Sequence, residues 1–349
     1  MTHRENYIRN TTFNNPAWMP ISIHCNLASL IEYKGELEDV IVKYPEYFGP
    51  FQKGSIDYSV YGDGKCSRRE KDAWGYVWNY TYHGLEGFVT DHPLDTWNKF
   101  DTYTPPDANE WMDRGGRIDW NAVKENLRKQ KEMGVLTSGY LVHGFLFLRL
   151  QYLRGFENVM VDMFDEEPKL FELIEMIDKE NLKIVRHYCD AKVDLMEVPE
   201  DLGSENSMVI SRDMFLKYIM PSYKKITSLC RENGVLTAIH SDGYIVDIME
   251  DLISVGMDII NPQDLCNGIE NIKRLLKGKC CIRLDLDRAK ITPYANRNEI
   301  FNLIEYEIKE LGSEKGGLEF IYGIYPPTPP DAVAYVCEAF KKYERYWFD

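Results

Sequence analysis

The chain has no excess of positive charge and no long apolar run. It carries 41 Lys and Arg residues against 56 Asp and Glu residues, a formal net charge of −15. Because phosphate backbones repel such a chain, we expect no nucleic-acid partner. The most apolar segment, residues 134–150, contains Ser138, His143 and Arg149, so no membrane span is expected. The polar start, Met1–Asn6, does not resemble a signal peptide, which predicts a cytoplasmic protein.

Several motifs of common enzymes are also missing. The eight cysteines form no CxxC pair, so we interpret them as reduced thiols. There is no GxSxG turn, which removes the usual signature of a serine hydrolase. Gly62–Lys65 is glycine-rich but lacks the spacing of either nucleotide-binding fingerprint.

From about Asp119 onward, short apolar runs alternate with longer amphipathic stretches. The expected strands are Met19–Ile23, Gly134–Gly139, Val193–Val198, Val235–Ile239, Met257–Ile260, Cys280–Leu284 and Leu318–Tyr322. The expected helices are Trp120–Met133, Pro168–Cys189, Ser211–Asn233, Tyr244–Val255, Ile269–Leu276, Arg297–Leu311 and Asp331–Tyr346. This alternation predicts an α/β fold with a parallel sheet, closed as a (β/α)8 TIM barrel. The irregular, aromatic first third is interpreted as an elaborated N-terminal section of one domain, residues 1–349.

The most informative stretch is Val235–Gly243, in which an apolar run ends in His240-Ser241-Asp242-Gly243. Side chains alternate along an extended strand, so His240 and Asp242 point the same way. Such a pair at a strand end suits two-point binding of a metal ion, or general acid-base catalysis in which Asp242 orients His240. The residues alone leave both alternatives open.

Other polar residues follow neighbouring strands, and in a barrel these positions meet at one rim. Glu200, Asp201 and Glu205 are candidate catalytic carboxylates. Cys266 is predicted as a metal ligand beside His240 and Asp242, with Tyr322, Glu205 and Asp264 as alternatives for the third position. Residues predicted to bind substrate are Trp74, Tyr140, His143, Phe145, Arg283 and Tyr322. The aromatic members of this set could form a wall for a flat substrate.

Taken together, the motifs resemble the uroporphyrinogen decarboxylase superfamily over nearly the whole chain. They are Arg154–Asn158, Glu200–Asn206, Met208–Ser211, His240–Gly243, Gly256–Pro262 and Pro327–Asp331. Asp72–Trp78 and His92–Leu94 resemble the branch that contains corrinoid-dependent methyltransferases. The resemblance implies a (β/α)8 barrel, in agreement with the alternation.

Two departures narrow what the resemblance implies. Met19–Cys25 has no arginine where decarboxylases of the family bind substrate carboxylates with an arginine-rich motif. The zinc-binding HxC pair of the methyltransferases is replaced by His240 and Asp242, and the later cysteine falls near Tyr322. The resulting ligand set is harder than one of histidine and cysteines, and it would suit a methyl group bound to oxygen.

The leading hypothesis is therefore a methyltransferase that takes a methyl group from a small methoxylated aromatic donor. The acceptor would be cobalamin on a separate corrinoid carrier protein, and a divalent metal, Zn²⁺, would bind at His240, Asp242 and Cys266. The alternative is a metal-independent decarboxylase or lyase with Arg283 on a substrate carboxylate. A third reading is a binding protein without catalysis. A homodimer is compatible with the sequence.

Overall fold

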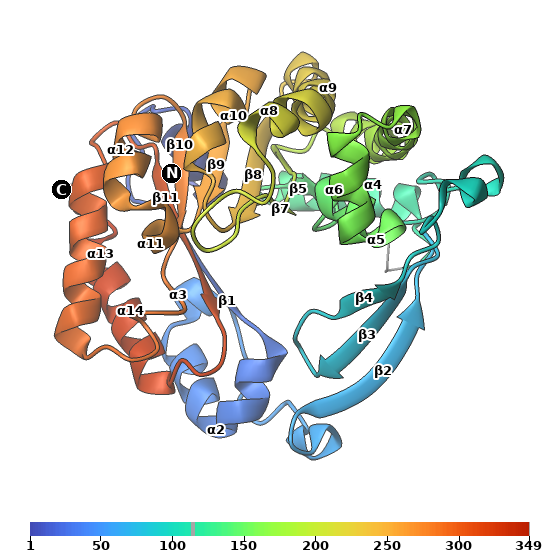
Figure 1. Ribbon diagram of the computed structural model, residues 1–349. Coiled ribbons are helices and arrows are strands. Elements are labelled where there is room, and N and C mark those ends of the chain that lie inside the picture. Colours follow the sequence, from blue (N-terminus) through green and yellow to red (C-terminus); the bar gives the residue numbers. More distant parts are fainter. Residues whose placement is uncertain (113–115, 349) are drawn as a thin grey trace.

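A curved parallel sheet forms the centre of the protein. The computed structural model describes residues 1–112 and 116–348, and its helices surround this sheet (Figure 1). Seven strands follow the order β1-β11-β10-β9-β8-β6-β5, and a short strand, β7, pairs with β8. They are β1 (Ile21–Cys25), β5 (Ser138–Tyr140), β6 (Leu195–Glu197), β7 (Glu200–Asp201), β8 (Leu236–Asp242), β9 (Ile259–Pro262), β10 (Cys281–Asp285) and β11 (Leu318–Ile324). The predicted α/β barrel class is confirmed.

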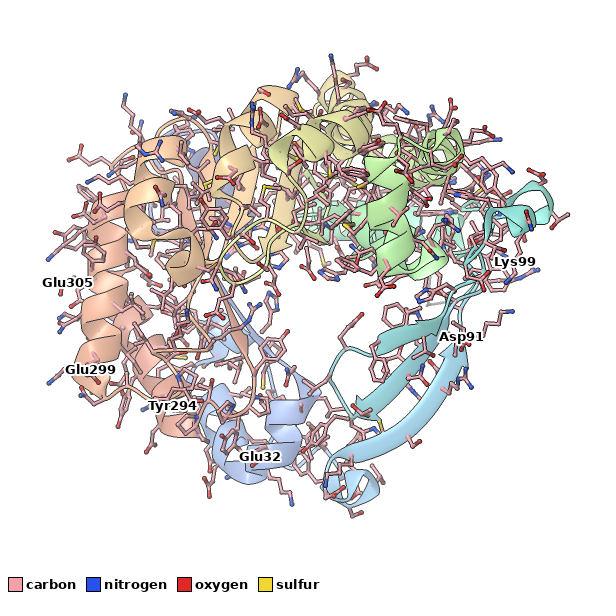
Figure 2. All side chains as sticks on the ribbon, in the orientation of Figure 1. Glu32, Asp91, Lys99, Tyr294, Glu299 and Glu305 are labelled. Carbon is pink, nitrogen blue, oxygen red and sulfur yellow. The ribbon has the colours of Figure 1, made fainter. Side chains whose placement is uncertain are left out.

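The outer layer consists of the helices that connect these strands. They are α2 (Leu27–Lys43), α3 (Pro45–Phe48), α4 (Trp120–Glu132), α5 (Phe147–Arg154), α6 (Phe156–Phe164), α7 (Pro168–Asp190), α8 (Arg212–Met214), α9 (Met220–Glu232), α10 (Met249–Val255), α11 (Asp264–Asn267), α12 (Ile269–Leu276), α13 (Arg297–Leu311) and α14 (Pro330–Tyr343). Shorter turns of helix are η1 (Tyr58–Tyr61), η2 (Trp97–Thr102), η4 (Phe215–Ile219) and η5 (Val246–Ile248). Each amphipathic helix packs its apolar side inward, whereas Glu299 and Glu305 of α13 point away from the sheet (Figure 2). In the described part of the chain, no helix has both the length and the apolar character needed to cross a membrane.

The sheet does not close in the way that the sequence predicts. Among the described strands, β1 pairs with β11 and β5 pairs with β6, but β1 and β5 do not pair with each other. An eighth barrel strand would be expected between α2 and α4. The chain there instead forms a separate antiparallel sheet of β2 (Lys65–Lys71), β3 (Val77–Tyr82) and β4 (Phe88–Asp91). This sheet lies beside the barrel, between α2 and α5 (Figure 1).

The N-terminal helix α1 (His3–Thr11) lies at the amino end of the strands. Its Tyr7 packs with Leu195, Ile259 and Cys281, which are interior residues of three different strands. The Tyr7 hydroxyl donates to Glu319 at 3.1 Å and accepts from the Arg283 guanidinium at 2.7 Å. The Tyr7 side chain occupies the centre of this end of the barrel, and a cavity of about 560 Å³ lies beside it, between β1 and β5.

Candidate active site

The cavity that contains the His240–Asp242 pair lies at the carboxyl ends of the strands and measures about 820 Å³. Alternate residues of each strand point inward, so the interior becomes more polar toward this end. On β8, the inward series runs from Leu236 through Ala238 to His240 and Asp242. The cavity is lined by His24, Glu86, His143, Glu197, Pro199, Asp201, His240, Asp242, Asn261, Arg283, Asp285, Arg288, Ile321, Gly323 and Tyr325. Of the predicted site residues, five line this cavity: His240, Asp242, Asp201, His143 and Arg283.

A neighbouring strand fixes the orientation of the His240 ring. His240 lies opposite Asn261 in the β8–β9 register, and its Nδ1 is 2.8 Å from the Asn261 side-chain oxygen. The Asn261 amide nitrogen donates to the Arg283 carbonyl at 2.5 Å, which leaves its oxygen as the acceptor. Nδ1 of His240 therefore carries a proton. Its Nε2 points to Asp242, with 3.2 Å between the nitrogen and Oδ1.

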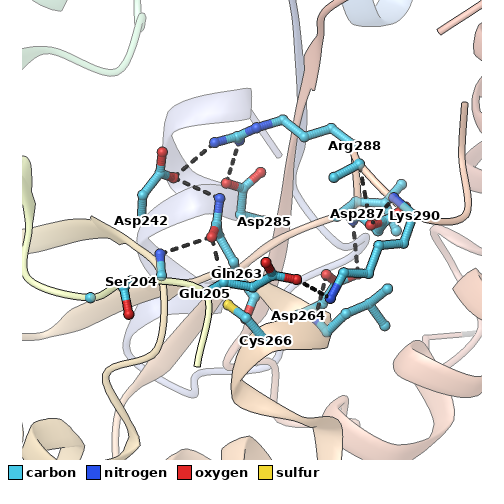
Figure 3. A pocket seen from close by; sticks show the side chains of 15 residues that line it. Ser204, Glu205, Asp242, Gln263, Asp264, Cys266, Asp285, Asp287, Arg288 and Lys290 are labelled. Carbon is cyan, nitrogen blue, oxygen red and sulfur yellow. Dashed lines mark hydrogen bonds and ion pairs between the residues drawn. The ribbon is translucent and has the colours of Figure 1, made fainter. Parts of the chain in front are cut away.

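Asp242 is held in its charged form by three neighbours. Besides His240, its Oδ1 accepts from Arg288 at 2.8 Å and from the Gln263 side chain at 2.7 Å (Figure 3). Burial opposes ionisation, but His240 and Arg288 outweigh it and lower the pKa of Asp242 to about 2. Burial also lowers the pKa of His240, while the Asp242 carboxylate raises it, and the net direction is upward.

A second histidine–carboxylate pair lies beside the first. Nε2 of His143 is 3.1 Å from Oδ1 of Asp201, and this pairing outweighs burial and raises the pKa of His143. The two pairs meet because Gly203 and Gly243 pack backbone to backbone. A Cβ on Gly243, where φ is +80°, would lie 2.3 Å from the Gly203 carbonyl carbon. Only glycine permits this close approach of the two loops.

Asp201, His240 and Asp242 form a group that could hold a metal ion. One ligand atom from each residue lies within 4.8 Å of the other two, at the cavity surface. Two carboxylates and one imidazole are ligands that a divalent cation such as zinc accepts, and the cavity side leaves a position open. The Nδ1 contact with Asn261 turns Nε2 toward the group, as is usual for metal-binding histidines. The residues present therefore fit a divalent metal.

The third member of this group is Asp201, and the prediction of Cys266 is not supported by the geometry. Cys266 lies on α11, where its thiol is 3.6 Å from the Gln263 side-chain oxygen. It lines a smaller pocket of about 380 Å³ on the outer side of Asp242 (Figure 3). Glu205 lines the same pocket, mostly exposed and 2.8 Å from Lys290. Neither side chain is a member of the group that His240 forms with Asp201 and Asp242.

Glu200, which the sequence suggests as a catalytic carboxylate, instead binds backbone groups at the start of α5. Its side chain is fully buried, and its two oxygens accept from the backbone N–H groups of Leu146 and Phe147 at 3.1 and 2.6 Å. These N–H groups belong to the first turn of α5, where helices leave donors unpaired. Burial raises the pKa of Glu200 to about 7. It points away from the cavity because its neighbour Asp201 points in.

Four residues predicted to contact substrate lie outside the cavity wall. Trp74 is buried under the Arg149 guanidinium, and Phe145 packs on Tyr223. Tyr140 is half exposed on the edge strand β5. Tyr322 faces the helix layer, since on β11 the neighbouring Ile321 and Gly323 take the inward positions. The predicted aromatic wall is therefore not formed by these residues.

Arg283 lies in the cavity wall, but carboxylates of the protein already occupy it. It contacts Glu197 at 2.9 Å and Glu319 at 2.6 Å, in addition to Tyr7. This pairing gives no support to the alternative in which Arg283 binds a substrate carboxylate. Sequence reasoning missed Glu197 and His24, although their alternation with outward residues on β6 and β1 was available as a signal. It also missed Arg288, for which the sequence offers no comparable signal.

The fold is that of an α/β-barrel enzyme, with a cavity at the carboxyl ends of the strands. The chain belongs to the uroporphyrinogen decarboxylase (URO-D) family, whose model matches residues 89–343. No curated protein sequence matches the chain significantly.

One solved structure shows the same fold over the full chain, and another is similar over part of it. A methyltransferase from Methanosarcina mazei is similar over 98% of this chain and 99% of its own, with 13% identity and a TM-score of 0.64. A B12-independent methionine synthase from Shewanella sp. W3-18-1 covers 65% of this chain and 68% of its own, with 11% identity and a TM-score of 0.44. The first of these likenesses shows that the barrel and the N-terminal section together form a known arrangement.

Proposed function

We propose that this protein is a methyltransferase that moves a methyl group from a small methoxylated donor to the cobalt of a separate corrinoid protein. The observation that carries the proposal is the Asp201–His240–Asp242 group, which is open to a cavity of a size suited to a small molecule. Membership of the URO-D family and the full-length likeness to a methyltransferase support it. Corrinoid cobalt would reach the donor at the cavity mouth, where the partner protein would dock.

The chemical requirement is stabilisation of the leaving oxygen. When the methyl carbon bonds to cobalt, the C–O electron pair stays on oxygen, and an alkoxide or phenolate leaves poorly unless its charge is neutralised. Asp201, His240 and Asp242 would hold a divalent metal that supplies a Lewis acid at this position. Asn261 keeps His240 oriented, and Arg288 and Gln263 position Asp242. The proton that the product oxygen needs is held on Nε2 of His143, beside Asp201.

Metal loading and methyl transfer test the proposal separately. We expect metal-depleted protein to take up about one equivalent of Zn²⁺, measured by elemental analysis after gel filtration, and His240→Ala to lose this binding. His83, a histidine outside the cavity, provides the matched control as His83→Ala. Zinc-loaded protein should then methylate cob(I)alamin carrier from a methoxylated donor, and His240→Ala should reduce the rate at least ~100-fold. Wild-type zinc binding and rate in His240→Ala would refute the proposal.

A further inference from the structure

One carboxylate oxygen in the cavity wall has no partner. Asp285 ends β10, its side chain is 3% exposed, and it lines the cavity beside His240. Its Oδ2 accepts from Arg288 at 2.6 Å, whereas Oδ1, which is itself buried, meets no hydrogen-bond donor among the described residues. Buried carboxylate oxygens are normally paired, so a bound group that donates here would complete the site.

The charges of the residues around Oδ1 of Asp285 indicate whether a bound ligand would be a cation or an anion. The cavity wall contains five carboxylates, those of Glu86, Glu197, Asp201, Asp242 and Asp285, and two guanidinium groups, those of Arg283 and Arg288. Both guanidinium groups are already bound to carboxylates of the protein. A divalent ion at Asp201 and Asp242 would offset those two residues and leave three carboxylates facing two guanidinium groups. The wall also contains three histidines, but burial lowers the pKa of His24, and His143 and His240 are already paired with Asp201 and Asp242. The cavity therefore favours a cation over an anion.

We propose that Asp285 binds a protonated amine, and that the substrate of this cavity carries such a group. The ammonium N–H would donate to Oδ1 of Asp285, the oxygen that Arg288 leaves unpaired. The site is distinct from the metal-binding group, which Asp285 does not join. That the methyl donor is a methoxylated amine rests on the proposed function. That the cavity binds a protonated amine does not depend on it.

Three probes of similar size and different charge test the proposal on the wild-type protein. Binding of propylammonium, propan-1-ol and propanoate is measured by ligand-observed NMR, with metal-free and with zinc-loaded protein. We expect propylammonium to bind at least ~10-fold more tightly than propan-1-ol in both forms, and propanoate not to bind. Equal affinity for the alcohol and the ammonium would overturn the proposal. Loss of propylammonium binding when zinc is added would also overturn it, because the amine would then bind at Asp201, His240 and Asp242 instead of Asp285.

A variant pair locates the site. Asp285→Asn keeps the shape of the side chain and removes its charge, and we expect at least a ~10-fold loss of propylammonium affinity. Glu314→Gln removes an exposed carboxylate that lines neither pocket and should change nothing. Unchanged affinity in Asp285→Asn would refute the assignment. These binding measurements use no corrinoid protein and do not depend on methyl transfer. If the protein transferred no methyl group from any donor, the proposed function would be refuted, but the measured preference for propylammonium would still stand.

Discussion

At the scale of single residues, the contact between Asn261 and His240 decides how His240 can be used. The imidazole has two nitrogens, and Asn261 takes the proton-bearing Nδ1. The other nitrogen is therefore directed at the Asp201–Asp242 side of the cavity. Without Asn261, the ring could rotate or bind through the wrong nitrogen.

Removing this contact should weaken metal binding without removing a metal ligand. We expect Asn261→Ala to lower Zn²⁺ affinity by about 10–100-fold, the usual effect of losing an outer partner of a metal-binding histidine. Competition with a chromophoric chelator measures the affinity. Asn261→Asp retains an acceptor oxygen for Nδ1 and should bind zinc at least as tightly as the wild type. Wild-type affinity in Asn261→Ala would show that the contact does not orient the ring.

A second residue-scale feature is the buried carboxyl pair Asp264 and Glu307. Glu307 is fully buried on α13, and apart from Asp264 its two oxygens meet no donor among the described residues. Burial raises the pKa of Asp264 to about 7 and raises that of Glu307 well above its usual range, with the neighbouring carboxyl adding to the effect on Glu307. The pair therefore holds a proton in the folded protein where the unfolded chain would release it.

This pair makes stability fall as pH rises. Unfolded carboxyl groups ionise at about pH 4, whereas the folded pair keeps its proton to about pH 7 or above. The folded state thus binds more protons in that window, and the wild-type melting temperature should fall from about pH 5 to about pH 8. We expect Glu307→Gln, which cannot ionise, to show a smaller fall. Glu314→Gln, at an exposed site, should behave as the wild type. An equal fall in both variants would contradict the explanation.

The residues of the site could be predicted where strand alternation decides their direction. His240, Asp242 and Asp201 follow from strand ends, and the structure brings them together. Glu200 and Tyr322 lie one residue away from inward positions, and such a one-residue difference in register reverses the face of a side chain. Trp74 depends on the path of a long irregular segment, which has no periodicity to interpret.

At the scale of elements, most helices and strands could be predicted, and the sheet β2–β3–β4 could not. Strand β2 has the sequence Lys-Cys-Ser-Arg-Arg-Glu-Lys and is almost entirely exposed, so it shows no alternation of apolar and polar residues. Antiparallel pairing with β3 defines it instead. Strand β8, by contrast, is longer than its apolar run indicates. It continues through His240 to Asp242 because β9 and β7 provide partners there.

An element-scale prediction concerns the start of α5. Glu200→Ala would leave the buried N–H groups of Leu146 and Phe147 without an acceptor. Since each unpaired buried donor costs about 1–3 kcal/mol, we expect unfolding to become easier by about 2–4 kcal/mol. Urea denaturation followed by circular dichroism measures this difference. Glu200→Gln keeps one acceptor oxygen, so its free energy of unfolding should decrease less than that of Glu200→Ala. If Glu200→Ala were as stable as the wild type, these two hydrogen bonds would not be needed to hold the start of α5.

At the scale of the whole molecule, the two ends of the chain hold each other. Tyr7 near the amino terminus contacts Glu319 on the last strand, and β1 pairs in register with β11 from Ile21–Phe320 to Cys25–Ile324. The buried Arg283 lies between them, with Glu197 on its other side. The charged interior is thus tied to the first helix.

Removing one hydroxyl tests this connection. Tyr7→Phe keeps the apolar packing but takes away the group between Arg283 and Glu319, and we expect a loss of about 1–3 kcal/mol in the free energy of unfolding. Tyr294→Phe, at a tyrosine that is 72% exposed, provides the control and should have no effect. Chemical denaturation at fixed pH measures both. Equal stability of the two variants would mean that the helix is held by packing alone.

The pairing of β1 with β11 also has a consequence during protein synthesis. Among the described strands, β1 has no ladder partner other than β11, whose residues are translated about 300 positions later. Ribosomes add roughly 5–20 residues per second, so the first strand waits on the order of tens of seconds before its partner emerges. During that interval, its edge is open to other nascent chains and to chaperones. We infer that the central strands can assemble before β1 gains its partner.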